Sequence, residues 1–298
     1  MIVNYPRMRR HRASWPDDLD TALEFSSANP FSISAPKNWD GKLEYTNGSG
    51  WKTWDGSAIA SGEIENNHCI YLRGTGNLKI TGVNSSSAKW DIIGTNIACN
   101  GDITLLLDYS TVKSGNRPAM ANYCYSFMFY GCTSLTAAPS LPATTLADYC
   151  YGSMFYGCTS LTAAPSLPAT TLASYCYGSM FYGCKSLTTA PSLPATTLAS
   201  FCYRSMFGGC TSLTTAPSLP ATTLASFCYN SMFYGCTSLK LSTTASGTYT
   251  KSYRIPKSGT GTTTSGALNG MFSNTGGTFK GTPKINTTYY LDESNTIV

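Results

Sequence analysis

Cysteine is the residue whose number and spacing in this chain most invite a chemical interpretation. Ten of the 12 cysteines fall into two columns that recur every 26 residues, eight residues apart within each copy. The columns are Cys124, Cys150, Cys176, Cys202 and Cys228, and Cys132, Cys158, Cys184, Cys210 and Cys236. Thiols in such patterns coordinate metals, form disulfides or pack in an apolar interior.

Packing is the interpretation that the cysteine spacing favours. Zinc sites use C-x2-C pairs and histidines, but the chain has no such pair and only His11 and His68. Cysteines eight residues apart on a helix would lie about 12 Å apart along its axis, too far for a disulfide. Equivalent cysteines of stacked copies would approach to about 5 Å, so disulfides between copies stay open. We expect two ladders of buried thiols.

No other constellation predicts catalysis. Between Tyr123 and Leu239 the charged residues are Asp148, Lys185 and Arg204, so no carboxylate pair is available to hydrolyse a glycoside. The chain has no G-x-S-x-G elbow, no P-loop and no recognisable triad around either histidine. Nucleic acid would require many more lysines and arginines on the repeat. We therefore expect no enzyme, no cofactor, no metal site and no nucleic-acid partner.

The elements that position these cysteines are copies of a 26-residue unit. Copies begin at Tyr123, Tyr149, Tyr175 and Phe201, and a truncated fifth copy begins at Phe227. A fixed period of this size predicts a solenoid, in which each unit buries its apolar face against its neighbours.

Each copy is predicted to contain about two turns of helix. The apolar residues Cys150, Met154, Phe155 and Cys158 fall on one helical face. The N-cap column is Asp148, Ser174, Ser200 and Ser226. A left-handed C-terminal cap is expected at Gly131, Gly157, Gly183, Gly209 and Gly235.

The rest of each copy contains two prolines, as at Pro165 and Pro168, which exclude long strands. Short parallel bridges remain, with Leu161, Leu167 and Leu172 pointing inward. Since helices pack farther apart than strands, the array is expected to curve with its helices outside.

Two columns of the repeat are candidates for ligand contact. The first is an aromatic row with polar tips, Tyr130, Tyr156, Tyr182 and Tyr234, which Gly208 interrupts. The second is the most variable column, Ser126, Gly152, Gly178, Arg204 and Asn230. Lys185 adds a charge nearby. Aromatic faces beside neutral hydroxyls suit carbohydrate or protein ligands, although a column free of packing also varies without any function.

The N-terminal part is expected to contain a basic arm (1–22), an antiparallel β-sandwich (23–108) and a linker (109–122). The arm carries Arg7, Arg9, Arg10 and Arg12, which are candidates for docking to an assembly or remain solvated. Short alternating segments such as Leu23–Ser26, Leu43–Thr46 and Leu78–Val83 predict the strands. The tryptophans at 39, 51, 54 and 90 could form a sugar-stacking platform or pack in the core.

The C-terminal part departs from the repeat. Residues 241–265 interrupt the period and are expected to form an inserted loop or hairpin. Residues 266–298 echo the repeat, with Met271-Phe272 matching Met232-Phe233 and Thr287-Thr288 matching Thr222-Thr223. Because the echo is more polar and lacks cysteine, it is predicted to be a degenerate capping repeat.

Composition and the N-terminal sequence indicate where the protein is expected to be located. The 298 residues are 42% hydrophobic but only 12% charged, with a net charge of +5. No apolar run approaches the roughly 20 residues of a membrane span. The N-terminus lacks the order of a signal peptide, so we expect a protein that stays inside the cell or leaves without a signal, for example on a virus particle released by lysis.

The repeat resembles one known family. Met154-Phe155-Tyr-Gly-Cys158-Thr-Ser-Leu161, followed by Pro165-Ser-Leu-Pro-Ala-Thr-Thr-Leu, is similar to BspA-like leucine-rich repeat proteins. The longer variant resembles copies in surface proteins of gut bacteria and in their phages and prophages, and residues 23–107 resemble the β-domain that precedes such repeats. The resemblance implies adhesion, ligand binding at a surface or a part in a phage tail, with no catalytic residues.

Two functional hypotheses follow. The favoured one is a non-enzymatic binding or adhesion protein on a virion or bacterial surface, which recognises a host glycan or protein through the repeats. The alternative is a structural virion component, in which the repeats are a spacer and the N-terminal half docks to other virion or surface proteins. Before assembly or release the chain would be cytoplasmic, and association of identical chains is left open.

Overall fold

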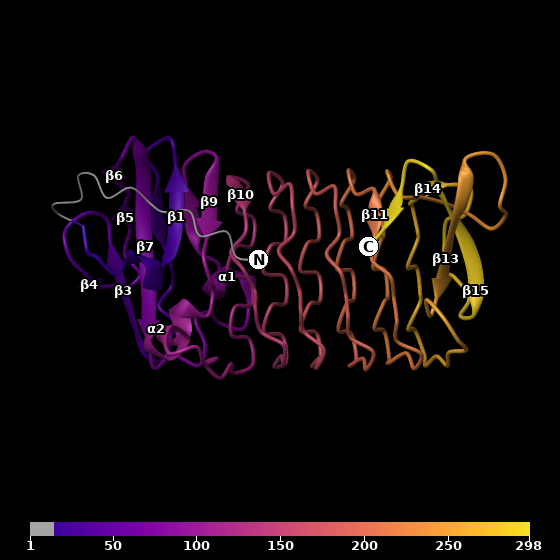
Figure 1. The fold of residues 1–298 in the computed structure, drawn as a ribbon, viewed down its shortest axis with the longest axis horizontal. Coiled ribbons are helices and arrows are strands. Elements are labelled where there is room, and N and C mark those ends of the chain that lie inside the picture. Colours follow the sequence, from indigo (N-terminus) through magenta and orange to yellow (C-terminus); the bar gives the residue numbers. More distant parts are fainter. Residues whose placement is uncertain (1–14) are drawn as a thin grey trace.

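The computed structural model describes residues 15–298, and the docking candidates Arg7, Arg9, Arg10 and Arg12 lie outside this range. The described chain is mainly β, with several sheets, none of them closed. Figure 1 shows an elongated molecule in which β-rich ends flank a row of similar coils. The coils are the 26-residue copies, lying side by side in chain order.

Two sheets form the N-terminal end. The larger has the strand order β10-β9-β1-β7-β3-β4, with β6 also paired to β7, and the smaller has the order β5-β2-β8. The strands are β1 (Leu23–Ser27), β2 (Ser32–Ser34), β3 (Lys42–Thr46), β4 (Lys52–Thr53), β5 (Ile59–Ala60), β6 (Gly62–Ile64), β7 (Asn67–Thr75), β8 (Asp91–Ile93), β9 (Ile97–Asn100) and β10 (Leu135–Ala137). Side chains from both sheets, including Phe25 and Ile33, belong to one buried core.

Helices are few and short. They are the 3-10 turn η1 (Leu19–Thr21) and the helices α1 (Ser85–Ala88) and α2 (Leu105–Lys113). Helix α2 has a kink at Asp108, whose φ and ψ are −155° and 100°. It reaches into residues 109–122, so the predicted linker begins as helix. None of the described helices has the length and apolarity needed to cross a membrane.

Three of the four tryptophans are core residues, which corrects the sugar-platform interpretation. Trp39, Trp54 and Trp90 are 6%, 2% and 1% exposed. The rings of Trp39 and Trp54 stack at 5.3 Å, and Trp90 meets Trp54 edge-on at 5.2 Å. The fourth, Trp51, covers the guanidinium of Arg73 at 3.9 Å. These four tryptophans therefore do not form an exposed platform.

The predicted helix within each copy is wrong. The segment from Tyr149 to Cys158, and its equivalent in each copy, is a run of overlapping turns. Amide groups alternate: Met154 N–H donates to the Tyr151 carbonyl within its own coil (3.2 Å), whereas Tyr151 N–H donates to Cys176 in the next coil (3.0 Å). Alternation of this kind satisfies the backbone of a segment that is neither helix nor strand.

A left-handed residue at every fourth position excludes the helix. In the second copy these are Tyr149, Ser153 and Gly157, with φ of 56°, 53° and 71°. The predicted left-handed glycine column is confirmed, but it ends a series of turns and caps no helix. The residues of the predicted apolar face are buried all the same, because the turns direct Cys150, Met154, Phe155 and Cys158 inward. The predicted curvature loses its basis, since no helix occupies the outer side of the copies.

The N-cap column has a different role from the one predicted. The side-chain oxygen of Asn122 accepts a hydrogen bond from Asp148 N–H (3.2 Å), and Asp148 accepts one from Ser174 N–H (2.8 Å). These contacts join neighbouring coils and cap no helix. The side chains of Asn122 and Asp148, which precede the first two copies, therefore help to hold the stacking register.

The proline-containing half of each copy forms the short parallel bridges that its sequence predicts. Isolated bridges join Thr145 to Thr171, Ala163 to Thr189 and Thr197 to Thr223. Leu161 and Leu167 are buried, whereas Leu172 is only partly buried.

Ladders of identical side chains fill the interior. The rings of Phe129, Phe155, Phe181, Phe207, Phe233 and Phe272 stack at 5.4 to 5.8 Å. A second buried ladder is Tyr125, Tyr151, Tyr177, Tyr203 and Tyr229, with spacings of 5.7 to 5.9 Å. Each copy therefore buries its rings against the copies on either side.

All 12 cysteines are buried and none forms a disulfide, which confirms the packing interpretation. The Cys184 thiol donates a hydrogen bond to the carbonyl of Phe155 in the preceding coil (3.1 Å), and Cys158, Cys210 and Cys236 repeat this contact. Each of these thiols therefore joins two coils by a hydrogen bond as well as by packing.

The N-terminal sheets cap the first copy. Strand β10 of that copy pairs in parallel with β9. Ile80 and Thr81 N–H both donate to the Cys124 carbonyl, and Trp90 N–H donates to Met128. The segment Leu78–Val83, predicted to be a strand, forms no strand: its first two amides donate to the Asp40 carboxylate and the next two to the first coil. A single core runs from Leu23 through the copies to Leu291.

At the other end, residues 262–273 take the place of a further coil. Tyr229 and Phe233 N–H donate to Ala267 and Met271, as they would to a sixth copy. The bridge column continues to Thr262, which lies in the predicted insertion. Thr287 and Thr288 do not join that column, because they lie in strand β15 (Thr287–Asp292), antiparallel to β13 (Tyr249–Ile255).

The C-terminal sheet has the order β13-β15-β12-β14, where β12 is Lys240–Ser242 and β14 is Gly276–Gly277. Strand β13, which lies in the predicted insertion 241–265, therefore pairs with β15 and not with another strand of that insertion. Strand β16 (Thr296–Ile297) returns to pair in parallel with β11 (Thr215–Ala216) of the fourth copy. It fills the position that the truncated fifth copy leaves open.

Candidate functional site

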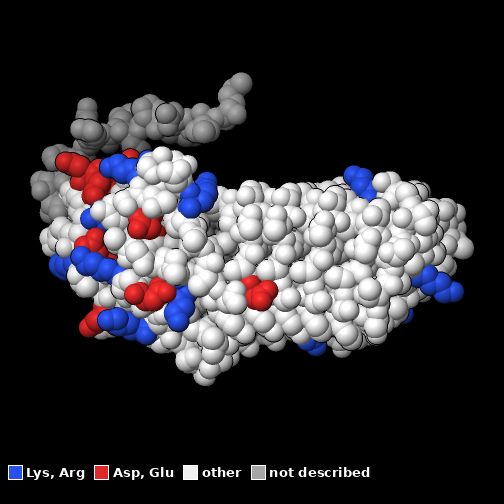
Figure 2. All heavy atoms as spheres, turned by 90° about the horizontal axis from the view of Figure 1, so that it is seen from below, with Lys and Arg blue, Asp and Glu red and all other residues white. Residues whose placement is uncertain are grey.

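The repeat surface is almost uncharged. In Figure 2 the acidic and basic side chains gather on the N-terminal end, while the coils present a face that is nearly free of charge. Contacts made by this surface must therefore rely mainly on hydroxyl groups, aromatic rings and backbone.

The predicted aromatic row forms, but its rings cover one another. Tyr130 stacks on Tyr156 at 4.6 Å, and Tyr156 stacks on Tyr182 at 4.9 Å. Gly208 interrupts the row, and the Tyr182 ring lies over it, since a Cβ there would be 2.6 Å from that ring. Tyr234, beyond the gap, is 41% exposed.

A second row of stacked rings opens each copy and was not predicted as a site. It consists of Tyr123, Tyr149, Tyr175, Phe201 and Phe227, with centroids 4.4 to 4.9 Å apart. The first residue of each copy has positive φ. That geometry is invisible in the sequence, where the tyrosine is read as the first residue of a helix.

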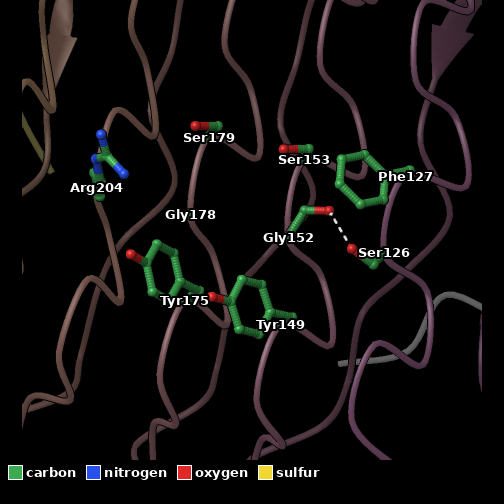
Figure 3. Close-up of a pocket in the computed structure, with 9 residues that line it drawn as sticks. All are labelled: Ser126, Phe127, Tyr149, Gly152, Ser153, Tyr175, Gly178, Ser179 and Arg204. Carbon is green, nitrogen blue, oxygen red and sulfur yellow. Dashed lines mark hydrogen bonds between the residues drawn. The ribbon is translucent and has the colours of Figure 1, made fainter. Parts of the chain in front are cut away.

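A groove lies beside this second row. Its volume is about 190 Å³, and it is lined by Ser126, Phe127, Tyr149, Gly152, Ser153, Tyr175, Gly178, Ser179 and Arg204. Figure 3 shows Tyr149 and Tyr175 on one side and Ser153 and Ser179 on the other. Four members of the predicted variable column therefore meet in one site, and Arg204 is the one charged residue among the lining residues.

The groove exists because two of its lining residues are glycines. Gly152 and Gly178 occupy the column between the tyrosine and serine rows and contribute no side chain. Their φ angles are not left-handed, and a Cβ on Gly178 would lie 3.3 Å from the Tyr175 ring and 3.4 Å from the Tyr175 carbonyl. Other copies carry serine, arginine or asparagine here, so the backbone accepts larger residues and the two glycines leave space.

The two ends of the groove differ. At one end Ser126 Oγ donates to the Gly152 carbonyl (3.0 Å), and the ring of Phe127 stands at the position that serine takes in later copies. At the other end is the exposed guanidinium of Arg204, whose central carbon lies 5.8 Å from the Phe201 ring centroid. The groove therefore has an apolar end and a cationic end.

One hydroxyl in each row, that of Tyr149 and that of Tyr156, has a raised pKa and stays neutral. Burial and the neighbouring phenols Tyr175 and Tyr123, together with Asp148, raise the pKa of Tyr149. Burial and its neighbours in the other row likewise raise the pKa of Tyr156. A protonated phenol both donates and accepts a hydrogen bond. The groove wall is thus suited to a ligand rich in hydroxyl groups.

Two other predicted residues lie outside the groove. Lys185 is exposed in a column where other copies carry threonine. Asn230 belongs to the variable column, but its amide donates to the Asn269 carbonyl (3.0 Å) and so holds the C-terminal coil. The structure brings together Arg204 and the glycines and separates them from the Tyr130 row, Lys185 and Asn230.

The thiols offer no reactive group. Burial raises the pKa of Cys184 from 9.0 to about 12, and Cys176 and Cys236 behave alike. The thiolate is the nucleophilic form, so these cysteines are inert at neutral pH. No group of three or more possible metal ligands occurs within residues 15–298.

No family model, curated protein or solved structure matches this chain.

Proposed function

We propose that this chain is a non-enzymatic binding protein whose stacked copies form a solenoid that recognises a glycan. The observation that carries the proposal is the groove in which the variable column meets Tyr149 and Tyr175. Four of the lining residues belong to the most variable column of the copies, as expected where a repeat has acquired a contact. The favoured ligand is a host surface glycan, with a protein ligand as the other outcome.

The chemistry of the groove supports a saccharide. Sugars present hydroxyl groups and apolar C–H faces, and the walls offer neutral hydroxyls on Tyr149, Tyr175, Ser153 and Ser179 beside an aromatic ring on Phe127. The volume of about 190 Å³ is below the roughly 300 to 1,000 Å³ of sites for drug-sized ligands. One sugar ring, or the end of a chain, is therefore the ligand that we propose.

The setting that we propose follows from the sequence resemblance. Repeats similar to the BspA-like family, after an N-terminal β-sandwich, imply a protein displayed on a phage particle or a bacterial surface. In this proposal the N-terminal half faces the particle or cell, and the copies extend away from it. The elongated shape in Figure 1 supports such an arrangement, because the coils extend away from the N-terminal sheets.

A structural role is the second candidate. The continuous core and the ladders of stacked rings favour it, since they make the copies a rigid spacer whether or not they bind a ligand. In that case the N-terminal part alone would contact other virion or surface proteins.

The test is binding of the full chain to a glycan array and to intact gut bacteria. Tyr149→Phe/Tyr175→Phe keeps both rings and removes their hydroxyls, and Phe201 and Phe227 show that the column accepts phenylalanine. Saturable binding that this variant weakens, and that Tyr123→Phe outside the groove leaves unchanged, would support the proposal.

Tyr156→Ala/Tyr182→Ala tests the other aromatic row. If this folded variant loses binding while Tyr149→Phe/Tyr175→Phe keeps it, the ligand binds at the Tyr130 row and not in the groove. If the full chain binds no glycan and no cell, the result would favour the structural role.

A further inference from the structure

Arg204 is a cation without an anionic partner. The five ion pairs found in residues 15–298 involve other residues, and none includes Arg204. Its side chain is exposed at one end of the groove, in a column where two neighbouring copies carry glycine. A charged residue in so uncharged an array has no evident role in stacking the coils.

Other charges do not compete with Arg204 in the groove. Asp148 lies two copies before it, beside Tyr149, and its carboxylate accepts a hydrogen bond from Ser174 N–H (2.8 Å). Lys185 belongs to a different column and lines no part of the groove. The groove therefore has a positive end at Arg204, and the acidic residue Asp148 lies toward its opposite end.

We propose that the groove binds a saccharide that carries a carboxylate, with the carboxylate held by Arg204. This inference rests on the proposed function and narrows the ligand to acidic sugars. The planar guanidinium presents paired N–H donors that match a carboxylate in a bidentate geometry. The sugar ring then lies over Gly152 and Gly178, between the tyrosine and serine hydroxyls.

The dimensions suit a ring plus its substituent. Phe127, Ser153, Ser179 and Arg204 belong to four successive copies, so the groove spans three intervals of about 4.8 Å, or about 14 Å in all. Phe127 closes the other end with an apolar ring, against which a sugar C–H face can pack.

An extended acidic peptide fits less well. Strand addition requires free backbone donors and acceptors at a sheet edge. Along the groove Ser153 N–H donates to Gly178, and Ser179 N–H donates to Arg204 (2.8 and 2.7 Å). The amides of Gly152 and Gly178 are bonded within their own turns. No free amide ladder remains to hold a peptide backbone.

The test compares three probes by equilibrium titration of the full chain. They are an oligosaccharide ending in glucuronate, the methyl ester of the same oligosaccharide, and its neutral parent ending in glucose. We expect the acid to bind the wild-type chain about tenfold more tightly than the ester or the parent, as for one charge-assisted hydrogen bond. Arg204→Gly restores the residue of the neighbouring copies and should remove this preference.

Lys185→Thr is the matched control. It also removes one positive charge from the array and restores the residue of other copies, so it should keep the tenfold preference. Equal affinity for acid, ester and parent in the wild-type chain would overturn the acidic assignment, while saturable groove binding of the neutral sugar would preserve the proposed function. A fourth titration uses a glutamate-rich peptide, and a preference for this peptide over every saccharide would overturn both proposals.

Discussion

The ring of Tyr149 stacks on the ring of Tyr175 with centroids 4.5 Å apart and planes inclined by 8°. Both residues have positive φ, at 56° and 55°, and each donates its N–H to the carbonyl of the residue that precedes the next copy, Ser174 and Ser200 respectively. Equal backbone conformation in consecutive copies places equal side chains in a straight row. The wall of the groove is thus a direct consequence of the repeat.

Gly183 should be far more sensitive to substitution than Gly178. Gly183 has φ of 74°, whereas Gly178 lies outside the left-handed region. We expect Gly183→Ala to lower the free energy of unfolding by about 1 to 2 kcal/mol because of its left-handed backbone. Gly178→Ala should change it by less than about 0.5 kcal/mol. Urea denaturation followed by circular dichroism measures both, and equal effects would contradict the turn geometry.

The buried thiols should make the protein sensitive to alkali. Burial raises the pKa of Cys132, Cys184 and Cys228 from 9.0 to about 12. Above pH 9 the unfolded chain releases these protons and the folded chain retains them, so stability falls as pH rises from 9 toward 12. We expect the urea midpoint to be flat from pH 7 to 8.5 and to fall above pH 9.

Thiol labelling gives an independent check on the same ladders. Native chain should react with iodoacetamide at pH 8 only as fast as it unfolds, whereas chain in urea should react at all 12 cysteines. Rapid labelling of native protein, or disulfide-linked copies, would show that the thiols are not packed as described.

Arg73 should hold the N-terminal sheet to residues 15–21. Its guanidinium lies between the rings of Trp51 (3.9 Å) and Tyr109 (4.3 Å) and pairs with Asp18 and Glu44. We expect Arg73→Met to cost about 2 kcal/mol, less than a fully buried pair, because Asp18 is partly exposed. Lys89→Met, at an exposed ion pair with Asp91, is the control and should cost under about 1 kcal/mol.

The same cluster predicts an acid dependence. Burial opposes ionisation of Asp18, but hydrogen bonds from Trp51 and Arg73 outweigh it and lower the pKa of that carboxyl. Hydrogen bonds from Lys42 and Arg73 lower the pKa of Glu44 in the same way. Stability from a lowered pKa is present above about pH 4 and is lost below it. The fall in the urea midpoint between pH 4 and 3 should therefore be shallower in Arg73→Met than in the wild-type chain.

Asn295 should be needed to close the C-terminal end. It is fully buried, accepts from Lys240 N–H (2.8 Å) and donates to the Ser238 carbonyl (2.9 Å). Asn295→Ala leaves both buried groups without their partner, so we expect a loss of about 2 to 3 kcal/mol. Asn29→Ala, at an exposed position near Thr95, should cost under about 0.5 kcal/mol. Similar losses in the two variants would mean that strand β16 contributes little.

The sequence predicts what is buried in each copy better than it predicts the backbone. Cys150, Met154 and Phe155 were placed inward correctly, because apolar residues at these spacings need a common interior. The helix was wrong because positive φ at Tyr149 and Ser153 carries no signal in residue type.

Elsewhere, whether a predicted strand forms depends on the segment to which it hydrogen-bonds. Leu23–Ser26 and Leu43–Thr46 became strands as predicted, since both pair with β7. Leu78–Val83 alternates just as well but bonds to the first copy instead. Of the candidate site, Arg204 and the glycine column were found through their variation, whereas the Tyr149 row was missed because it is nearly uniform.

The most direct test of the central claim is a titration of the wild-type and Gly178→Asn chains with the glycan that binds most strongly on the array. Asparagine fills the groove floor, and Asn230 shows that this column accepts it. We predict an unchanged thermal unfolding midpoint and at least a tenfold loss of affinity for Gly178→Asn. Equal affinity of the two folded chains would contradict the account, because the ligand would then bind without the groove.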